Sequence, residues 1–498
     1  MKNIVNFIQF IRAVEPRDPE RNLYLPIEKT LAMLEQYKFK GTFLIQYDAM
    51  LDGKYVSAIK NKGHDIGLWL EVVQPLCESV GIKWNGRYPW DWYNDVGFLI
   101  GYEPEQRKLL IDLAMKKFKE TFGEYPKCVG SWHIDAVSFR YLDERYHITA
   151  ACICRDQVGT DGYTLQGGYY NQAYYPCKSN MLCPAQNKEN QINIPVFRML
   201  GSDPVREYDR QACLTLEPAQ AGKNPRWVDW FLSENFNGFG LSCQYTQVGQ
   251  ENSFGWDWVK DGLPYQFKKI SQMQKSGTVE VMTLTEAGGY YKRSFDKTPA
   301  STQAFFSGFN EAVKSFWFNC AYFRENFMFE NNTARFRDIY VFCERLKEKY
   351  LEKRCDVHTC EYRNLPIIDG YLYSADKKAG LYFIRENGIT LWDDCTYDEE
   401  NSMAYITLTG GNTVLKVGIS QNGIAVTGNE EFYLAFMNIS TQCNAPELTH
   451  YTAAYHDEKT LSFEFSGISY SLKLIYGTLT DDFKMLSSDK RLSFVFIS

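Results

Sequence analysis

The feature that most constrains this chain is a pattern repeated over its first 295 or so residues. A short apolar run rich in β-branched and aromatic residues ends in polar or acidic residues, and a helical or loop stretch usually follows. Runs buried on both faces and alternating with helices are typical of a parallel sheet, and seven or eight such units predict a distorted β/α barrel. The runs are VNFIQFIRAVE, GTFLIQYD, HDIGLWLEV, CVGSWHID, ITAACICRD, IPVFRMLGSD, GFGLSCQYTQ and VEVMTLTEAG.

The segments between these runs are of two kinds. Apolar residues at helical spacing predict helices over residues 26–38 and 104–123. Residues 74–102 and 157–191 are instead long insertions rich in Gly, Tyr and Asn. Insertions after barrel strands lie at the C-terminal face, so both are expected to border an active site.

The pattern changes after residue 295. The segments 304–327 and 335–353 predict a helical connector over residues 296–354. From about residue 355 onward, alternating runs separated by QNG and ENG turns predict an antiparallel β-sandwich. The predicted domains are therefore a catalytic barrel (1–295), the connector (296–354) and the sandwich (355–498).

Charge and cysteine usage narrow the range of partners. The net charge is −7 and there is no long basic run, so no nucleic-acid partner is expected. No apolar stretch approaches the roughly 20 residues that span a bilayer, and the first residues lack the features of a signal peptide. The 14 cysteines form no CxxC pair, which indicates free thiols and a cytoplasmic location. The sequence leaves a homo-oligomer open.

Acidic residues follow the predicted strands. Because the carboxyl ends of parallel strands meet at one edge, at least two of these acids are expected to line one site. The alternative is that they are helix N-caps or loop salt bridges. The acids at predicted strand ends are Glu15, Asp48, Glu71, Asp135, Asp156, Asp203, Glu251 and Glu286. Of these, Glu251 and Glu286 are the first catalytic candidates, with Asp135, Glu71 and Glu15 as rivals.

Aromatic residues make up 16% of the chain, which suits sugar-ring stacking, although most aromatic side chains in any protein are core residues. Tryptophans near strand ends are candidate sugar platforms, and arginines there could bind an acidic sugar. The predicted substrate-binding residues are Arg12, Asp48, Trp69, Trp90, Asp91, Trp132, His133, Asp156, Arg198 and Gln244.

Motifs for metals and cofactors are missing from the sequence. It contains no HxxxH, HExxH, GxSxG, P-loop or GxGxxG pattern, and a lone His in an apolar run is more often a core residue than a ligand. An oxygen-only Ca²⁺ or Mg²⁺ site could be built from the acids but has no motif behind it. We therefore predict no metal and no cofactor.

The stretches GTFLIQYDAM and GHDIGLWLEV resemble the second and third strands of the polysaccharide deacetylase superfamily. That family has a distorted β/α barrel and holds a metal with an Asp-Asp pair on the first strand and an HxxxH on the third. Here FIQFIRAVEP lacks the Asp pair, and Trp69 and Val73 take the places of the histidines. The resemblance therefore implies the barrel but puts metal-dependent deacetylation in doubt.

A closer resemblance is to bacterial proteins of the gut type that join a deacetylase-like barrel to a C-terminal β domain. It is carried by FIRAVEPR, GRYPWDW, GSWHIDA, GTDGYTLQGGYYNQAYYP and PVFRMLGSDP, and it covers residues 1–300 well and the remainder loosely. It implies the architecture more strongly than any activity.

Three hypotheses follow from these features. The leading one is a metal-independent glycoside hydrolase that uses two carboxylates and acts on a carbohydrate or glycoside. The second is a deacetylase-type hydrolase with an unusual oxygen-ligand metal site. The third is a noncatalytic carbohydrate-binding protein.

Overall fold

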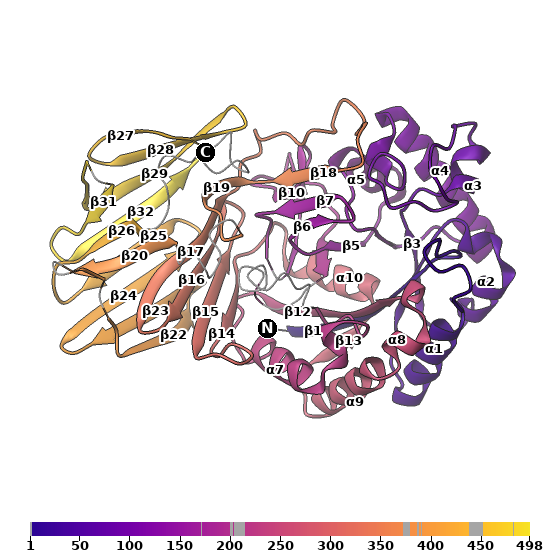
Figure 1. The fold of residues 1–498 in the computed structure, drawn as a ribbon, viewed down its shortest axis with the longest axis horizontal. Coiled ribbons are helices and arrows are strands. Elements are labelled where there is room, and N and C mark those ends of the chain that lie inside the picture. Colours follow the sequence, from indigo (N-terminus) through magenta and orange to yellow (C-terminus); the bar gives the residue numbers. More distant parts are fainter. Residues whose placement is uncertain are drawn as a thin grey trace.

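The computed structural model describes residues 2–170, 172–199, 203, 215–371, 379–385, 388–389, 391–437, 452–481 and 483–498. A sheet of parallel strands carries the N-terminal part (Figure 1), in the order β12-β1-β2-β3-β4-β5-β11, with β8 added antiparallel to β11 and β13 paired with β1. Each of the eight predicted runs contains one of these strands. The strands are β1 (Lys2–Ile11), β2 (Thr42–Ile45), β3 (Asp65–Trp69), β4 (Cys128–Gly130), β5 (Ala150–Cys154), β8 (Ala173–Tyr174), β11 (Val196–Met199), β12 (Cys243–Glu251) and β13 (Glu280–Met282).

Closure of this sheet into a barrel stays a prediction. No strand pairing between β8 and β12 occurs among the described residues. Side-chain contacts span the gap: the amide of Gln172 lies 3.4 Å from Oε1 of Gln244 in β12, and the rings of Phe197 and Tyr245 lie 4.9 Å apart.

Helices connect the parallel strands, and both predicted helices are confirmed. The second of them, α4, has Pro104 in its first turn and a capping box between Glu103 and Gln106, and it ends at Gly123 with φ +94°. The helices are α1 (Leu25–Tyr37), α2 (Gly53–Ile59), α3 (Gln74–Ser79), α4 (Pro104–Phe122), α5 (Ala136–Tyr146), α7 (Pro225–Asn235), α8 (Trp256–Val259), α9 (Gly262–Lys275) and α10 (Leu284–Ser294), with 3₁₀ turns η1 (Ala49–Leu51), η2 (Leu99–Gly101), η3 (Ala221–Lys223) and η4 (Asn252–Phe254).

The predicted helical connector is wrong. Residues 301–341 form four antiparallel strands, β14 (Ser301–Phe305), β15 (Val313–Asn319), β16 (Phe323–Glu330) and β17 (Thr333–Val341). A tight turn at Asn331 and Asn332, both with positive φ, joins the last two. These strands are buried on both faces, so their apolar residues do not alternate cleanly and the period of two is hidden.

Two antiparallel sheets make up the C-terminal part, which begins at Ser301 rather than near residue 355. The first runs β14-β15-β16-β17-β20-β26-β31-β30, and the second runs β22-β23-β24-β25-β32-β29-β28-β27. They share one hydrophobic cluster, in which the rings of Phe336 and Phe494 lie 6.4 Å apart. The further strands are β19 (Leu365–Ile368), β20 (Gly380–Arg385), β21 (Gly388–Ile389), β22 (Asp394–Glu400), β23 (Met403–Gly410), β24 (Thr413–Ser420), β25 (Gly423–Gly428), β26 (Tyr433–Met437), β27 (Thr452–His456), β28 (Thr460–Phe465), β29 (Ile468–Tyr476), β30 (Thr478–Leu479), β31 (Lys484–Leu486) and β32 (Arg491–Ile497).

The insertion at residues 157–191 lies against the C-terminal part. Its strands β6 (Gln157–Thr160) and β7 (Tyr163–Gln166) form a small sheet with β18 (Cys360–Arg363), which pairs parallel to β7. A separate two-stranded sheet contains β9 (Pro176–Cys177) and β10 (Asn180–Pro184). In Figure 1, β14–β17 lie between the parallel sheet and the remaining antiparallel strands. The two parts of the chain are therefore joined by strand pairing as well as by packing.

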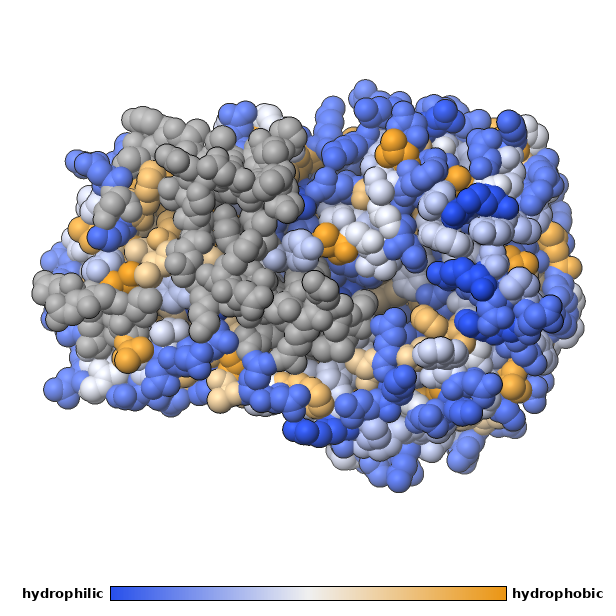
Figure 2. Space-filling model, in the orientation of Figure 1, coloured by the Kyte–Doolittle hydropathy of each residue, from blue (hydrophilic) through white to orange (hydrophobic). Residues whose placement is uncertain are grey.

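The thiol prediction is confirmed for the described residues, in which every cysteine is a buried free thiol. Within the same residues, no helix is both long and apolar enough to span a membrane. Outside the grey atoms, the face in Figure 2 is mainly hydrophilic, with apolar residues scattered over it.

Gly167 is expected to be the more sensitive of two glycines in the 157–191 insertion. Both Gly159 (φ +69°) and Gly167 (φ +77°) are left-handed, but a Cβ at Gly167 would lie 2.3 Å from the Tyr340 ring, while a Cβ at Gly159 would contact nothing. Gly159→Ala should therefore cost about 1–2 kcal/mol of stability from backbone strain. Gly167→Ala should cost a further ~1–3 kcal/mol through the clash. Urea unfolding midpoints measure both, and equal losses would show that the insertion yields at Tyr340.

Candidate active site

A cavity of about 370 Å³ lies at the carboxyl ends of the parallel strands. This is the edge at which β/α folds place their ligands. Its lining comes from the ends of five strands, from the start of the 157–191 insertion and from residues 215–220. The lining residues are Phe10, Arg12, Glu15, Arg17, Arg21, Trp132, Cys154, Arg155, Gln157, Thr160, Asp161, Tyr163, Met199, Thr215, Leu216, Glu217, Gln220, Gln247, Gly249, Glu251, Ser253 and Phe254.

Arg12, directly after β1, organises the charges at this edge. Its Nη2 and Nε bind the two carboxylate oxygens of Glu71 at 2.6 and 3.0 Å, and its Nη1 forms an ion pair with Glu251. Gln46 donates to Glu71 as well, at 2.8 Å. Burial opposes the charge on Arg12, but Glu251 and Glu71 outweigh it, so the pKa of Arg12 lies above its ordinary value. The guanidinium is therefore a fixed positive charge that holds two carboxylates.

Glu251 ends β12 and lies on the cavity, with its side chain 12% exposed. Its Oε2 accepts a hydrogen bond from Ser253 at 2.8 Å in addition to the contact with Arg12. Burial raises the pKa of Glu251 above its ordinary value, although the charge of Arg12 and the hydrogen bond of Ser253 oppose the increase. Both donors contact the same oxygen, so the orientation of the carboxylate is fixed.

Glu217 is a second carboxyl group on the same cavity. Its Oε1 accepts one hydrogen bond, from the backbone of Ala219 at 3.2 Å. Burial raises the pKa of Glu217 well above its ordinary value, and the charge of Glu251 adds to the increase. The cavity thus holds two carboxyl groups. Glu217 favours its protonated form, and Glu251 is held by the guanidinium of Arg12.

Of the three tryptophans predicted to bind sugar, only Trp132 lines the cavity, where it is partly exposed. Trp69 is buried, with its ring centroid 4.1 Å from Phe10 and 5.3 Å from Trp132. Trp90 is also buried and stacks under Arg12, with 4.1 Å between Cζ and the ring centroid. Trp69 and Trp90 therefore support the site from behind and cannot touch a ligand in the cavity.

Glu15 lines the cavity and is held by Arg17 through bonds of 2.7 and 2.9 Å. Burial opposes ionisation of Glu15, but the hydrogen bonds and charge of Arg17 outweigh it and leave its pKa below the ordinary value. Such a carboxylate is a stable acceptor for a ligand hydroxyl and a poor proton donor.

Two of the predicted catalytic acids lie elsewhere. Glu286 forms the capping box of α10 with Thr283, and half of its side chain is exposed. Asp135 is the buried N-cap of α5 and binds Arg107 at 2.9 Å. Both follow the alternative that strand-end acids serve as helix caps. Neither reaches the cavity.

Four other predicted residues are held within the protein away from the cavity. Asp91 accepts two bonds from Arg87, at 2.8 and 2.9 Å. His133 contacts Asn94 at 2.9 Å, and burial lowers the pKa of the imidazole to about 3. The Gln244 amide donates to backbone carbonyls at 2.6 and 2.9 Å, and Asp203 is buried against Ser315.

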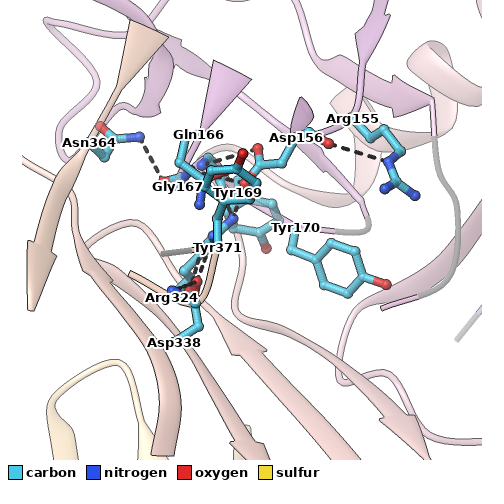
Figure 3. Close-up of polar contacts among 12 residues, drawn as sticks. Arg155, Asp156, Gln166, Gly167, Tyr169, Tyr170, Arg324, Asp338, Asn364 and Tyr371 are labelled. Carbon is cyan, nitrogen blue, oxygen red and sulfur yellow. Dashed lines mark hydrogen bonds and ion pairs between the residues drawn. The ribbon is translucent and has the colours of Figure 1, made fainter. Parts of the chain in front are cut away.

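Asp156 and Arg198 do not line the cavity, although Asp156 is the chain neighbour of the lining residue Arg155, which lies beside it in Figure 3. Arg198 binds Asp156 at 2.7 Å and the carbonyl of Cys154 at 3.2 Å. Burial opposes the charge on Asp156, but Arg324 and Arg198 outweigh it and hold its pKa below the ordinary value. These predicted ligand-binding residues are therefore structural partners of one another.

The residues at the expected metal position do not fit a metal. Trp69 fills the place of one histidine with a buried ring, Val73 is fully buried, and Arg12 brings a cation to the end of the first strand. Among the residues described by the structure, no three His, Cys, Asp or Glu side chains gather as metal ligands.

Asp48, the cap of η1, gives a test of this buried charge environment. Burial raises its pKa to about 7, and the charge of Glu71 adds to this although the Ala49 hydrogen bond opposes it. The folded protein retains a proton that the unfolded chain releases, so stability should fall as the pH rises toward 7 and then level off. The stability of Asp48→Asn relative to the wild type should therefore increase as the pH rises from 4 to 8, as measured by urea titration.

The matched control is Asp52→Asn, at the exposed cap of α2. The pKa of Asp52 lies below its ordinary value, mainly because the carboxylate accepts a hydrogen bond from the backbone N–H of Lys54. Its stabilising contribution is present above its ordinary pKa and is lost as the pH falls, so Asp52→Asn should show no such gain. A gain for Asp48→Asn that does not depend on pH would mean that the carboxyl group stays neutral throughout.

Sequence analysis missed Glu217 and the residues around it. The stretch 200–224 follows β11 and has no helical or strand period, so no strand end pointed to Glu217. Asp161 and Tyr163, in the second insertion, also line the cavity and are not among the predicted site residues.

Comparison with solved structures identifies the fold. A protein from Parabacteroides distasonis described as a glycoside hydrolase/deacetylase superposes with a TM-score of 0.54 at 15% identity, over 76% of this chain and 93% of its own. This chain therefore shares its fold with that protein over most of both chains. At this identity the similarity extends to the fold and not to the activity.

Two further solved structures match more loosely. A protein from Pseudomonas aeruginosa PAO1 described as a polysaccharide deacetylase (12% identity, TM-score 0.38) covers 59% of this chain and 92% of its own. A family 4 acetyl xylan esterase from Clostridium thermocellum (14% identity, TM-score 0.27) covers 59% and 94%. No protein-family profile and no curated protein sequence matches the chain.

Proposed function

We propose that this protein is a carbohydrate-active hydrolase, and specifically a glycoside hydrolase that needs no metal. The observation that carries the proposal is the pair Glu217 and Glu251, two carboxyl groups on one cavity at the carboxyl edge of the parallel sheet. Two carboxyl groups with different protonation are what hydrolysis of a glycosidic bond requires. The description of the Parabacteroides distasonis protein is compatible with this chemistry.

Glu217 is the general acid in this proposal. Burial and the charge of Glu251 raise its pKa and so favour its protonated form, which can protonate the oxygen of the leaving group as the glycosidic bond breaks. Glu251 is the carboxylate partner because Arg12 and Ser253 orient its charged form. It acts on the anomeric carbon directly or through a water molecule, depending on its separation from the acid when substrate is bound.

Trp132 is the sugar platform of this site. It is partly exposed on the cavity and is braced edge-on by Phe10 and Trp69, so a sugar ring can stack on it without a change in the core. Glu15 would accept sugar hydroxyl groups as a carboxylate held by Arg17.

Arg12 supports the metal-independent form of the proposal. It places a permanent positive charge between Glu71 and Glu251, at the edge where relatives of this fold would place a cation. In this proposal, residues 1–295 close into a barrel and form the catalytic unit. The antiparallel part is a second domain.

The experiment that tests the proposal is hydrolysis of a panel of aryl glycosides and acetylated sugars, each with and without EDTA. We expect glycoside cleavage that EDTA leaves unchanged. Acetate release that EDTA abolishes would overturn the proposal and indicate a metal-dependent deacetylase. Sugar binding without turnover, detected by calorimetry, would indicate a binding protein.

A further inference from the structure

Part of the cavity is built by a segment that the parallel sheet does not hold. Residues 155–163, here called the 155–163 wall, leave the end of β5 and form β6 and the turn into β7. β7, which begins at Tyr163, pairs with β18 from the later part of the chain. The wall residues on the cavity are Arg155, Gln157, Thr160, Asp161 and Tyr163.

A buried chain of alternating charges ties this wall to the antiparallel sheet (Figure 3). Asp156 binds Arg198 through Oδ1 at 2.7 Å and Arg324 of β16 through Oδ2. Arg324 in turn forms a bidentate pair with Asp338 of β17, at 2.9 and 3.0 Å. All four groups are buried, and their charges balance, as a buried network of this kind requires.

The contacts of Arg324 and Asp156 leave little freedom. The guanidinium of Arg324 lies 5.3 Å from the Trp317 ring centroid and 4.8 Å from that of Tyr340, and it also donates to the carbonyl of Gly168 at 2.9 Å. Asp156 also accepts the backbone N–H of Gly167 at 2.9 Å. A shift of Arg324 would therefore be transmitted to Asp156.

Arg155 is the residue next to this anchor. It lines the cavity, and its Nε donates to the carbonyl of Asp156 at 3.3 Å. The orientation of Arg155 thus depends on the residue that Arg324 holds. A guanidinium on this cavity is suited to hydrogen-bond the hydroxyl oxygens of a bound sugar.

We propose that Arg324 of the antiparallel domain is a positioning residue of the active site, which acts through Asp156 to fix Arg155 and the 155–163 wall against the substrate. The proposal rests on the proposed function. It assigns the C-terminal domain a part in building the site, in place of a role as an appended binding module.

The test compares Arg324→Gln with Arg107→Gln. Arg107 is a matched control because it is equally buried and also bridges two parts of the chain, binding Asp135 at 2.9 Å and the carbonyl of Tyr350 at 2.7 Å. Unlike Arg324, it makes no hydrogen bond or ion pair with residues 155–163 in the part of the chain that the structure describes. Amide hydrogen exchange should accelerate within residues 155–163 in Arg324→Gln and remain at the wild-type rate there in Arg107→Gln. Asp338→Asn should give a weaker form of the same change if Arg324→Gln does not fold.

Kinetics provide the second readout. Arg324→Gln should lower kcat/KM about 10–100-fold, mainly through KM, because a misplaced contact residue weakens substrate binding. The double variant with Arg155→Gln should lose less kcat/KM than the product of the two single fold-losses. Arg324→Lys should lose less activity than Arg324→Gln. A double variant whose fold-loss equals the product of the two single fold-losses would overturn the proposal.

The two readouts separate this proposal from the proposed function. Unchanged exchange in residues 155–163 in both Arg324→Gln and Asp338→Asn would refute the positioning role even if glycoside hydrolysis is found. Faster exchange in a protein that cleaves no glycoside would confirm that Arg324 holds the wall and would refute the proposed function instead.

Discussion

Glu217→Gln is expected to lower kcat about 10²–10⁴-fold on aryl glycosides whose leaving group is a poor one, because the amide cannot protonate the departing oxygen. The same variant should lose far less activity on a dinitrophenyl glycoside, which leaves without protonation. The measurement is kcat and KM for both substrates. Equal losses on the two would show that Glu217 is not the acid.

The pH dependence of this reaction follows from the same group. Since the pKa of Glu217 is raised, the alkaline limb of wild-type activity, where Glu217 loses its proton, should lie at higher pH than for an ordinary glutamate. Glu217→Gln should remove that alkaline limb. Glu251→Gln should instead lower kcat on both substrates, because the carboxylate is needed whichever group departs.

Glu286→Gln is the matched control for these two variants. Glu286 is an acid at the end of a parallel strand, as Glu251 is, but it caps α10 away from the cavity. Because Gln also serves at this position of a capping box, the substitution should cost only about 0.3–1 kcal/mol of stability and leave kcat unchanged. A loss of kcat comparable with that of Glu251→Gln would show that the cavity has been wrongly identified as the active site.

The elements that the sequence predicted correctly are those whose side chains show one clear pattern. Most of the eight parallel strands are buried on both faces and lead into polar residues, and α4 has its own proline start and glycine stop. The same kind of pattern did not reveal the four strands from β14 to β17. In β15, Phe316 and Phe318 face the hydrophobic core, while Ser315, Trp317 and Asn319 are buried on the opposite face, so burial alone shows no alternation.

The candidate site was predictable only where it lies at strand ends. Arg12 and Glu251 directly follow paired parallel strands, β1 and β12, so a shared edge brings them together. Glu286 does not lie at this edge, because β13 is only three residues long and the acid belongs to the helix that follows. Glu217 and Arg324 come from segments whose return to the cavity edge is a tertiary contact, and no local pattern encodes it.

Arg12→Met is expected to cost about 3–5 kcal/mol of folding stability, since it leaves the carboxylates of Glu71 and Glu251 buried without their counter-charge. The loss should grow as the pH rises, because the two acids can be neutral only at low pH once the guanidinium is gone. Urea unfolding at pH 5 and pH 8 measures both effects. A loss that does not change with pH would mean that Arg12 stabilises the fold by packing on Trp90 and not by its charge.

Arg17→Met is the matched control for Arg12→Met, because Arg17 lines the same cavity and pairs with Glu15 but has a side chain that is 48% exposed. Water screens that pair, so its removal should cost no more than about 1 kcal/mol. Adding Glu71→Gln to Arg12→Met should recover much of the stability by removing one of the orphaned charges. It should not recover activity, because Glu251 would still lack the donor that orients it. Stability and catalysis would then separate at one residue, as expected if the guanidinium serves as the permanent cation of this site.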